Sequence, residues 1–252
     1  MSILSPFRRL RNLRDYRFVN MKALPRLAEK NHLRRLIAHY KIDCIFDVGA
    51  NYGQYAEMLR TKVGFEGLII SFEPIPSAVQ ILRAKAANDP RWIVEGIALS
   101  SQNGKQTFNI MKGSEFSSLR KPSHESIDRY KHINVVEQEV EVTTETLGSA
   151  LARLKSKHRF NQPFLKMDTQ GYDVEIVSHA KDAVREFIGL QSELSVKRIY
   201  DGATGYRDAL ALYESCGFQL SAFVPNNSPH FPHLIEVDCI MVRDIPHAKK
   251  SA

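Results

Sequence analysis

The sequence predicts an α/β fold: a doubly wound sheet that is mostly parallel and carries an antiparallel C-terminal strand. Three observations support this prediction. Short apolar runs of strand length alternate with amphipathic segments along the 252 residues. The first apolar run ends in a glycine-containing turn at residues 49–53, and two alternating runs, at 219–224 and 237–243, close the chain. Strands that alternate with helices form parallel sheets, and a terminal pair adds a reversed strand at the edge.

The first elements follow from hydrophobic spacing. Apolar residues at helical intervals predict a helix over residues 32–40, and unbroken apolar runs predict strands at 44–48 and 68–72. Between these strands, an amphipathic stretch predicts a helix over residues 53–61. A strand–turn–helix–strand unit of this kind brings backbone N–H groups close to a ligand.

The next helix begins at Pro76, because proline suits the first turn of a helix. Residues 92–94 lead into a third strand near 97–99, and a polar turn follows at 101–104. We expect the buried side of this helix to consist of Ala78, Val79, Ile81 and Leu82.

Two alternating segments, residues 106–111 and 140–144, predict antiparallel edge strands. The stretch between them is polar and has little periodicity. It is too long for an ordinary connection, which indicates a binding loop or lid.

The C-terminal half repeats the alternation of helix and strand. Residues 147–154 are predicted as a helix and residues 163–167 as the fourth strand, after which Gly171 opens another helix. The fifth strand is expected at 187–194. A helix over residues 206–216 then precedes the terminal antiparallel pair.

The formal net charge of +7 is concentrated at the N-terminus. Residues 1–41 hold eleven lysines and arginines against two acids, so the remainder is slightly acidic. We therefore interpret 1–41 as a basic helical arm, 42–245 as the domain and 246–252 as a flexible tail. Apolar residues recur at every third position from Leu4 to Tyr16, a period that drifts around a helix. We interpret the arm as packing on the domain or forming a homodimer. Peripheral contact with an anionic membrane is the alternative, and nothing resembles a module that reads nucleic acid.

The three cysteines are widely separated and lie in apolar segments, so we interpret them as buried free thiols. Free thiols suit a reducing compartment. No apolar run approaches the roughly 20 residues that span a bilayer, and the N-terminus lacks the apolar centre of a secretory signal. We therefore expect a cytoplasmic protein, with peripheral membrane association through the arm left open.

The most informative segment is the turn after the first strand. The strand ends in Asp47, and Gly49, Asn51 and Gly53 follow at alternate positions. Asparagine replaces glycine at low cost where φ is positive. Glu73 lies about 20 residues beyond Gly53, the spacing expected of an acid that binds ribose hydroxyls. The segment therefore predicts an adenosine-containing cofactor.

Two classes of adenosine-containing cofactor are candidates for this turn. A nicotinamide fingerprint needs glycines where Asn51 and Gln54 stand, which disfavours an NAD-dependent oxidoreductase. Longer motifs distinguish the remaining cofactor classes. They lie at residues 46–53, 72–74, 98–100, 165–171 and 237–243. Through them, roughly residues 42–245 resemble the FkbM family of class I S-adenosylmethionine-dependent methyltransferases.

The resemblance implies a Rossmann-like fold and S-adenosyl-L-methionine as cofactor. It also implies O-methylation of a hydroxyl on a sugar, glycan or glycosylated natural product. The cofactor-binding residues that follow from it are Asp47, Gly49, Asn51, Tyr52, Gly53, Glu73 and Ala98. Family members often carry glutamate at the position of Gln170.

Acids end four of the predicted strands, where ligands of such sheets bind. Asp168, at the end of the fourth strand, is the candidate catalytic residue, because a carboxylate can accept the proton of an attacking hydroxyl. His124 and His230 are the alternatives. A magnesium site at Asp168 would need further oxygen ligands, and the next acid is Asp173, so no metal is expected.

The acceptor is expected to contact four residues. Ser117 and Ser118 belong to a serine-containing stretch that resembles one in the family, Glu193 ends the fifth strand, and His230 lies in a rigid loop near the C-terminus. A non-catalytic cofactor-binding or membrane-adaptor protein remains the alternative to an enzyme. The intact Gly49 and Asp168 argue against it.

Overall fold

The computed structural model describes residues 26–124, 130–225 and 232–244. Its main sheet has seven strands, and only β10 runs against its neighbours. The strands, in spatial order, are β3 (Trp92–Glu95), β2 (Leu68–Phe72), β1 (Cys44–Val48), β7 (Pro163–Met167), β8 (Gly189–Ser195), β10 (Glu236–Arg243) and β9 (Phe218–Pro225). The strand order reverses between β1 and β7, which confirms the doubly wound, mostly parallel sheet with an antiparallel C-terminal strand.

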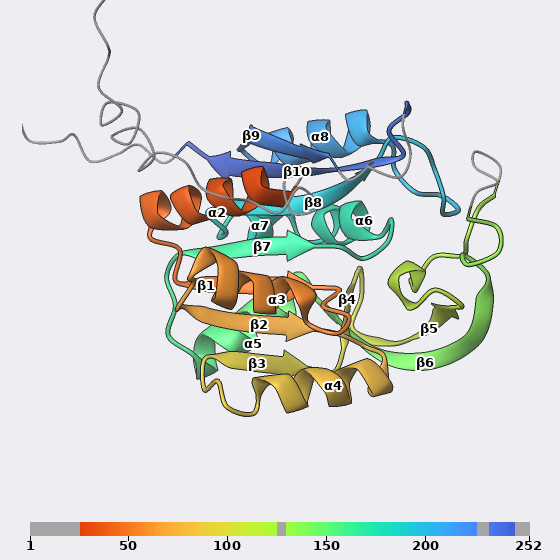
Figure 1. Ribbon diagram of the computed structural model, residues 1–252, viewed down its shortest axis with the longest axis horizontal. Coiled ribbons are helices and arrows are strands. Elements are labelled where there is room, and N and C mark those ends of the chain that lie inside the picture. The colour runs from red at the N-terminus through yellow and green to blue at the C-terminus, as the bar shows by residue number, and fades with distance from the viewer. Residues whose placement is uncertain (1–25, 125–129, 226–231, 245–252) are drawn as a thin grey trace, which may run out of the picture.

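Helices cover both faces of the sheet (Figure 1). One face carries α2 (Leu27–Tyr40), α3 (Gln54–Met58) with the π-helical turn Leu59–Val63, and α4 (Pro76–Ala86). The other face carries α5 (Leu147–Lys157), α6 (Asp173–Ser178), α7 (Lys181–Val184) and α8 (Tyr206–Ser215). Alternate residues of β1 serve the two cores: Ile45 packs on the first face and Phe46 on the second. Burial on both faces explains why this strand is a continuous apolar run.

A second, three-stranded sheet lies beyond the carboxyl ends of the main strands, where the arrowheads of β2 and β7 point in Figure 1. It consists of β4 (Ala98–Ser100), β6 (Val136–Thr146) and β5 (Gly104–Met111). Two expectations are corrected here. The third strand is split between the two sheets as β3 and β4, and the two antiparallel strands pair with each other rather than with an edge of the main sheet.

Most predicted boundaries agree with the structure, and β1, β2 and β7 agree residue for residue. The prediction of the buried side of α4 is partly wrong, because Ile81 is 43% exposed whereas the other three predicted residues are buried. A single-turn helix, Ser114–Phe116, occupies the start of the long loop. The three cysteines are free and buried, as predicted.

The last part of the predicted arm packs on the main sheet. Leu33 and Leu36 of α2 are buried in the core, and His32 Nε2 lies 2.9 Å from Ser221 Oγ of β9. The remainder of the arm, residues 1–25, and the tail from residue 245 lie outside the described residues, so the domain boundaries stay predictions. Among the described helices, none is long and apolar enough to cross a membrane.

Candidate functional site

A cavity of about 560 Å³ opens at the carboxyl ends of β1, β2, β7 and β8, around the point where the strand order reverses. Ligands of open α/β sheets bind at this point, and cavities of 300–1,000 Å³ hold small ligands. Seven residues predicted from the sequence line it: Gly49, Asn51, Glu73, Ala98, Ser117, Asp168 and Glu193. The second sheet and its loops supply the opposite wall through Phe108, Ser114, Phe116 and Tyr130.

The turn after β1 has the predicted backbone. Gly49, Asn51 and Gly53 have φ of 76°, 48° and 84°, so asparagine does occupy a left-handed position. A Cβ on Gly49 would lie 2.0 Å from the carbonyl oxygen of Asp168, so the ends of β1 and β7 approach too closely for any side chain. A Cβ on Gly53 would instead lie 2.8 Å from Leu82 Cδ2. Gly53 therefore allows the turn to pack closely against α4. It does not line the cavity.

Glu73 links the ends of β1 and β2. Its Oε2 accepts a hydrogen bond from the backbone N–H of Asn51 at 2.8 Å, and its Oε1 accepts one from Ile75 at 2.9 Å. The residue is only 4% exposed, and burial raises the pKa of its carboxyl to about 7, although these two N–H groups favour the charged form. Each oxygen keeps a free lone pair, so the fixed carboxyl can still accept hydroxyl hydrogens from a ligand.

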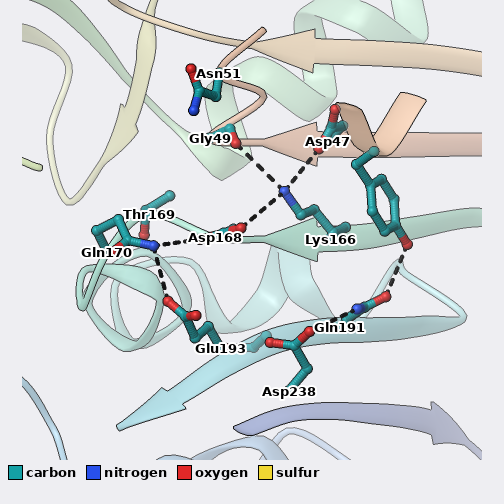
Figure 2. Close-up of polar contacts among 12 residues, drawn as sticks. Asp47, Gly49, Asn51, Lys166, Asp168, Thr169, Gln170, Gln191, Glu193 and Asp238 are labelled. Carbon is teal, nitrogen blue, oxygen red and sulfur yellow. Dashed lines mark hydrogen bonds and ion pairs between the residues drawn. The ribbon is translucent and has the colours of Figure 1, made fainter. Parts of the chain in front are cut away.

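Beneath the turn lies a buried ion pair that the sequence reasoning missed (Figure 2). Lys166 Nζ lies 3.1 Å from Asp47 Oδ1, 3.5 Å from the carbonyl oxygen of Gly49 and 3.7 Å from Asp168 Oδ2. Burial opposes the charge on Lys166, but the carboxylates of Asp47 and Asp168 outweigh it and raise the pKa of the ammonium. Asp47 is fully buried and does not line the cavity, so it supports the turn through Lys166.

Asp168 is the exposed member of this group. Its side chain is 43% exposed, whereas those of Lys166 and Asp47 are 8% and 0% exposed. Its Oδ1 accepts a hydrogen bond of 2.7 Å from Gln170 Nε2, and the same nitrogen donates to Glu193 Oε2 at 3.0 Å. Asp168 and Glu193 therefore share one amide group on the wall of the cavity, as Figure 2 shows.

Further carboxyls surround Glu193. Burial raises the pKa of Glu193 well above its usual range, and it raises the pKa of Glu236 to about 8 and that of Asp238 to about 7. Glu236 lines the cavity and was not predicted, because it begins the last strand rather than ending one. Within the described part of the chain, no group of three or more metal-ligating side chains could hold a metal ion.

The remaining predicted residues lie away from the cavity wall. Ser118 is fully buried, and its hydroxyl donates toward the carbonyl oxygens of Thr169 and Gln170, so it holds the loop after β7. Tyr52 and His124 do not line the cavity. His230 lies outside the described residues.

The sheet order, the left-handed turn and the fixed acid at the end of β2 define a cofactor-binding α/β domain of the Rossmann-like class. Residues 47–220 match the model of the methyltransferase FkbM domain. The chain belongs to this family and is an S-adenosylmethionine-dependent methyltransferase. The family assignment removes the NAD-dependent oxidoreductase as an alternative.

Solved structures with a similar fold are distant. Magnesium protoporphyrin IX methyltransferase from Synechocystis PCC 6803, with bound S-adenosylhomocysteine, has a TM-score of 0.46 and 9% identity over 94% of each chain. A fibrillarin pre-rRNA processing protein of Methanococcus jannaschii has a TM-score of 0.46 and 10% identity over 80% of this chain and 66% of that chain. Fibrillarin of Aeropyrum pernix, with natively bound S-adenosyl-L-methionine, has a TM-score of 0.42 and 12% identity over 79% and 66%. No curated protein sequence matches the chain.

Proposed function

We propose that this methyltransferase acts on oxygen, and that its acceptor is a hydroxyl group of a sugar, glycan or glycosylated natural product. The observation that carries the proposal is the half-exposed carboxylate of Asp168 on the wall of the cofactor cavity. It lies where the strand order reverses, next to the turn that would hold the cofactor. A carboxylate in this place can accept the proton of a hydroxyl.

The residues of the cavity fit S-adenosylmethionine. Apolar side chains, among them Phe72, Leu99 and Phe108, line one part of it and suit the adenine ring. The fixed carboxyl of Glu73 suits the ribose hydroxyls, and the turn at Gly49 and Asn51 would face the methionine part. When bound, the cofactor supplies an electrophilic methyl group on a sulfonium.

The protein's own part in the reaction is to orient the acceptor and to remove its proton. With the methyl group that the cofactor would supply, the acceptor oxygen would be methylated, and the carboxylate of Asp168 would take up the proton that the hydroxyl loses. The ammonium of Lys166 lies 3.7 Å from Asp168 Oδ2, next to the proposed base. Ser117 and Glu193, both on the cavity wall, are the proposed acceptor contacts.

A separate proposal concerns the location of the protein in the cell. Three free buried thiols support a cytoplasmic location. The basic N-terminal residues support peripheral membrane contact or a homodimer as the two roles to be tested, by vesicle sedimentation and by light scattering.

The activity is tested by transfer of labelled methyl from S-adenosylmethionine to a panel of sugars and glycosides, with Asp168→Asn as the decisive variant. We expect this variant to lose at least 100-fold in turnover, since general-base catalysis contributes roughly 10²–10⁴-fold. Its affinity for S-adenosylhomocysteine should change little. Asp182→Asn, at a side chain that is 98% exposed, is the matched control. A normal rate in Asp168→Asn would remove the proposed base.

A further inference from the structure

The side chain of Gln170 lies at the centre of the polar contacts around Asp168. Its Nε2 donates to Asp168 Oδ1 at 2.7 Å and to Glu193 Oε2 at 3.0 Å. Its Oε1 accepts a hydrogen bond of 2.7 Å from the hydroxyl of Tyr200. Both hydrogens and the oxygen of the amide are thus used, and each contacts a different residue.

The two carboxyls, together with Tyr200, set which way the amide points. The side chain of Tyr200 is 1% exposed, and burial raises the pKa of its hydroxyl well above the usual range, so the hydroxyl remains a donor. This donor lies 2.7 Å from Gln170 Oε1 and 3.0 Å from the carbonyl oxygen of Phe116. The opposite orientation of the amide would place its oxygen against the oxygens of two carboxyl groups, whereas the observed orientation places its NH₂ there and its oxygen within reach of the Tyr200 hydroxyl. The two amide hydrogens therefore face Asp168 and Glu193.

The backbone that carries Gln170 is also held in place. Gln170 and Gly171 both have left-handed φ, of 55° and 83°. The buried hydroxyl of Ser118 donates toward the carbonyl oxygen of Gln170 at 2.9 Å, and Arg120 Nε donates to that of Gly171 at 2.8 Å. The segment around Ser118 and Arg120, which is bridged to Asn109 of β5, thus fixes the loop, and with it the side chain that joins the two carboxyls.

The two carboxyls joined by Gln170 have opposite surroundings. Asp168 is partly exposed and lies near the ammonium of Lys166, whereas Glu193 is half-buried on the cavity wall and is surrounded by other acids. Pairs of acids whose surroundings differ in this way divide the roles of acid and base between them. The charged and titratable groups around the pair are Lys166 of β7, Asp47 of β1, Asp173 of α6, Glu236 and Asp238 of β10, Glu115 of the short helix, and Tyr200.

We propose that Gln170 is a positioning residue that holds Asp168 as the proton acceptor, apart from Glu193, by donating one amide hydrogen to each carboxyl. The inference rests on the proposed function, since it concerns the same base. Glutamine suits this position because its amide donates to two carboxyls without adding a charge. A glutamate would bring a third carboxyl into the contact, and one of the three would have to take up a proton.

Two variants test the proposal. Gln170→Glu keeps an acceptor for Tyr200 but replaces the donor by a carboxyl, and Gln170→Met removes the donor without adding charge. We expect the acidic limb of the pH profile of kcat/KM to move upward by about one unit or more in Gln170→Glu, and by less in Gln170→Met. Gln138→Glu, at an exposed position of β6, makes the same chemical change away from the site and should leave the profile unchanged.

A second readout does not depend on activity. Carbon-13 NMR titration of the Glu193 carboxyl should show a higher midpoint in both Gln170 variants, while the affinity for S-adenosylhomocysteine stays within about threefold of the unmodified protein. If both variants lose rate but keep the original pH profile and the original titration of Glu193, Gln170 only supports the loop and the proposal is overturned. If the unmodified protein binds S-adenosylhomocysteine but methylates no hydroxyl, the proposed function fails, and the NMR titration still decides the role of Gln170.

Discussion

At the scale of single residues, Glu73 and Lys166 show two ways of using a buried ionisable side chain. Glu73 is held by two backbone N–H groups and keeps lone pairs toward the cavity, which suits contact with a ligand. Lys166 is enclosed by Asp47, Asp168 and the carbonyl of Gly49, which suits support of the turn. Loss of Glu73 should therefore affect binding, and loss of Lys166 should affect stability.

We expect Glu73→Ala to weaken the affinity for S-adenosylhomocysteine tenfold or more, since a charge-assisted hydrogen bond contributes about 1.5–3 kcal/mol. Calorimetric titration measures this affinity. Glu66→Ala, at an exposed position before β2 and so at the opposite end of that strand from Glu73, is the control and should bind normally. An unchanged affinity in Glu73→Ala would exclude the residue from the cofactor site.

Lys166→Met should lower the free energy of unfolding by about 3–5 kcal/mol, because it leaves the fully buried Asp47 without a counter-charge. The double variant Asp47→Asn/Lys166→Met removes both charges and should recover part of this loss. Urea denaturation of the two variants measures the difference. Equal losses in both would show that the ion pair is not what the single substitution disrupts.

The residues of the site differ in how far the sequence reveals them. Gly49, Asn51, Glu73, Asp168 and Glu193 were found because each ends a recognisable strand or lies in the turn after one. Lys166 had a signal that was not used, since it is the one charged residue of an otherwise apolar strand. The role of Gln170 had none, because its contacts depend on a left-handed loop and on Tyr200, 30 positions away.

At the scale of elements, the turn between β1 and α3 depends on close contact between strands. Gly49 and Gly64 both have left-handed φ, of 76° and 78°, but a Cβ on Gly64 would meet nothing within 4 Å. Gly64→Ala should therefore cost only the strain of about 1–2 kcal/mol. Gly49→Ala adds a clash with the carbonyl of Asp168.

We expect Gly49→Ala to destabilise the protein by at least about 1 kcal/mol more than Gly64→Ala, since overpacking typically costs 1–3 kcal/mol. It should also weaken binding of S-adenosylhomocysteine, whereas Gly64→Ala should not. Denaturation and calorimetry of the pair measure both effects. Similar results for the two variants would mean that β1 and β7 can separate without cost.

The main sheet was predicted well because strands buried on both faces have unbroken apolar runs, as in residues 44–48 and 163–167. The second sheet was not, because β4 has only three residues and its paired residues in β6 are 46 positions away, as for Ala98 and Thr144. Periodicity shows that a segment is a strand, but it does not show which sheet the strand joins. Ile81 was misplaced because apolar character alone does not define the buried side of α4.

At the scale of the whole molecule, three carboxyls with raised pKa values make stability depend on pH. The folded-state pKa values of Glu73, Glu236 and Asp238 are raised to about 7, 8 and 7, chiefly by burial. In the unfolded chain these groups lose their protons near their ordinary values, close to pH 4. Between roughly pH 4 and 8 the folded protein therefore binds more protons than the unfolded chain, and its stability falls as the pH rises.

We therefore expect the cofactor-free protein to unfold less readily at pH 5.5 than at pH 8.5. One pKa unit corresponds to about 1.4 kcal/mol, so the difference should be on the order of 3 kcal/mol, with the acids coupled to one another. Chemical denaturation at constant ionic strength measures it. Asp238→Asn removes one of the raised groups and should reduce the difference, whereas Asp182→Asn at the exposed control position should not. If the protein were instead more stable at pH 8.5, these carboxyls would be charged in the folded state. Solvent or Lys166 would then stabilise their charged form more than burial destabilises it.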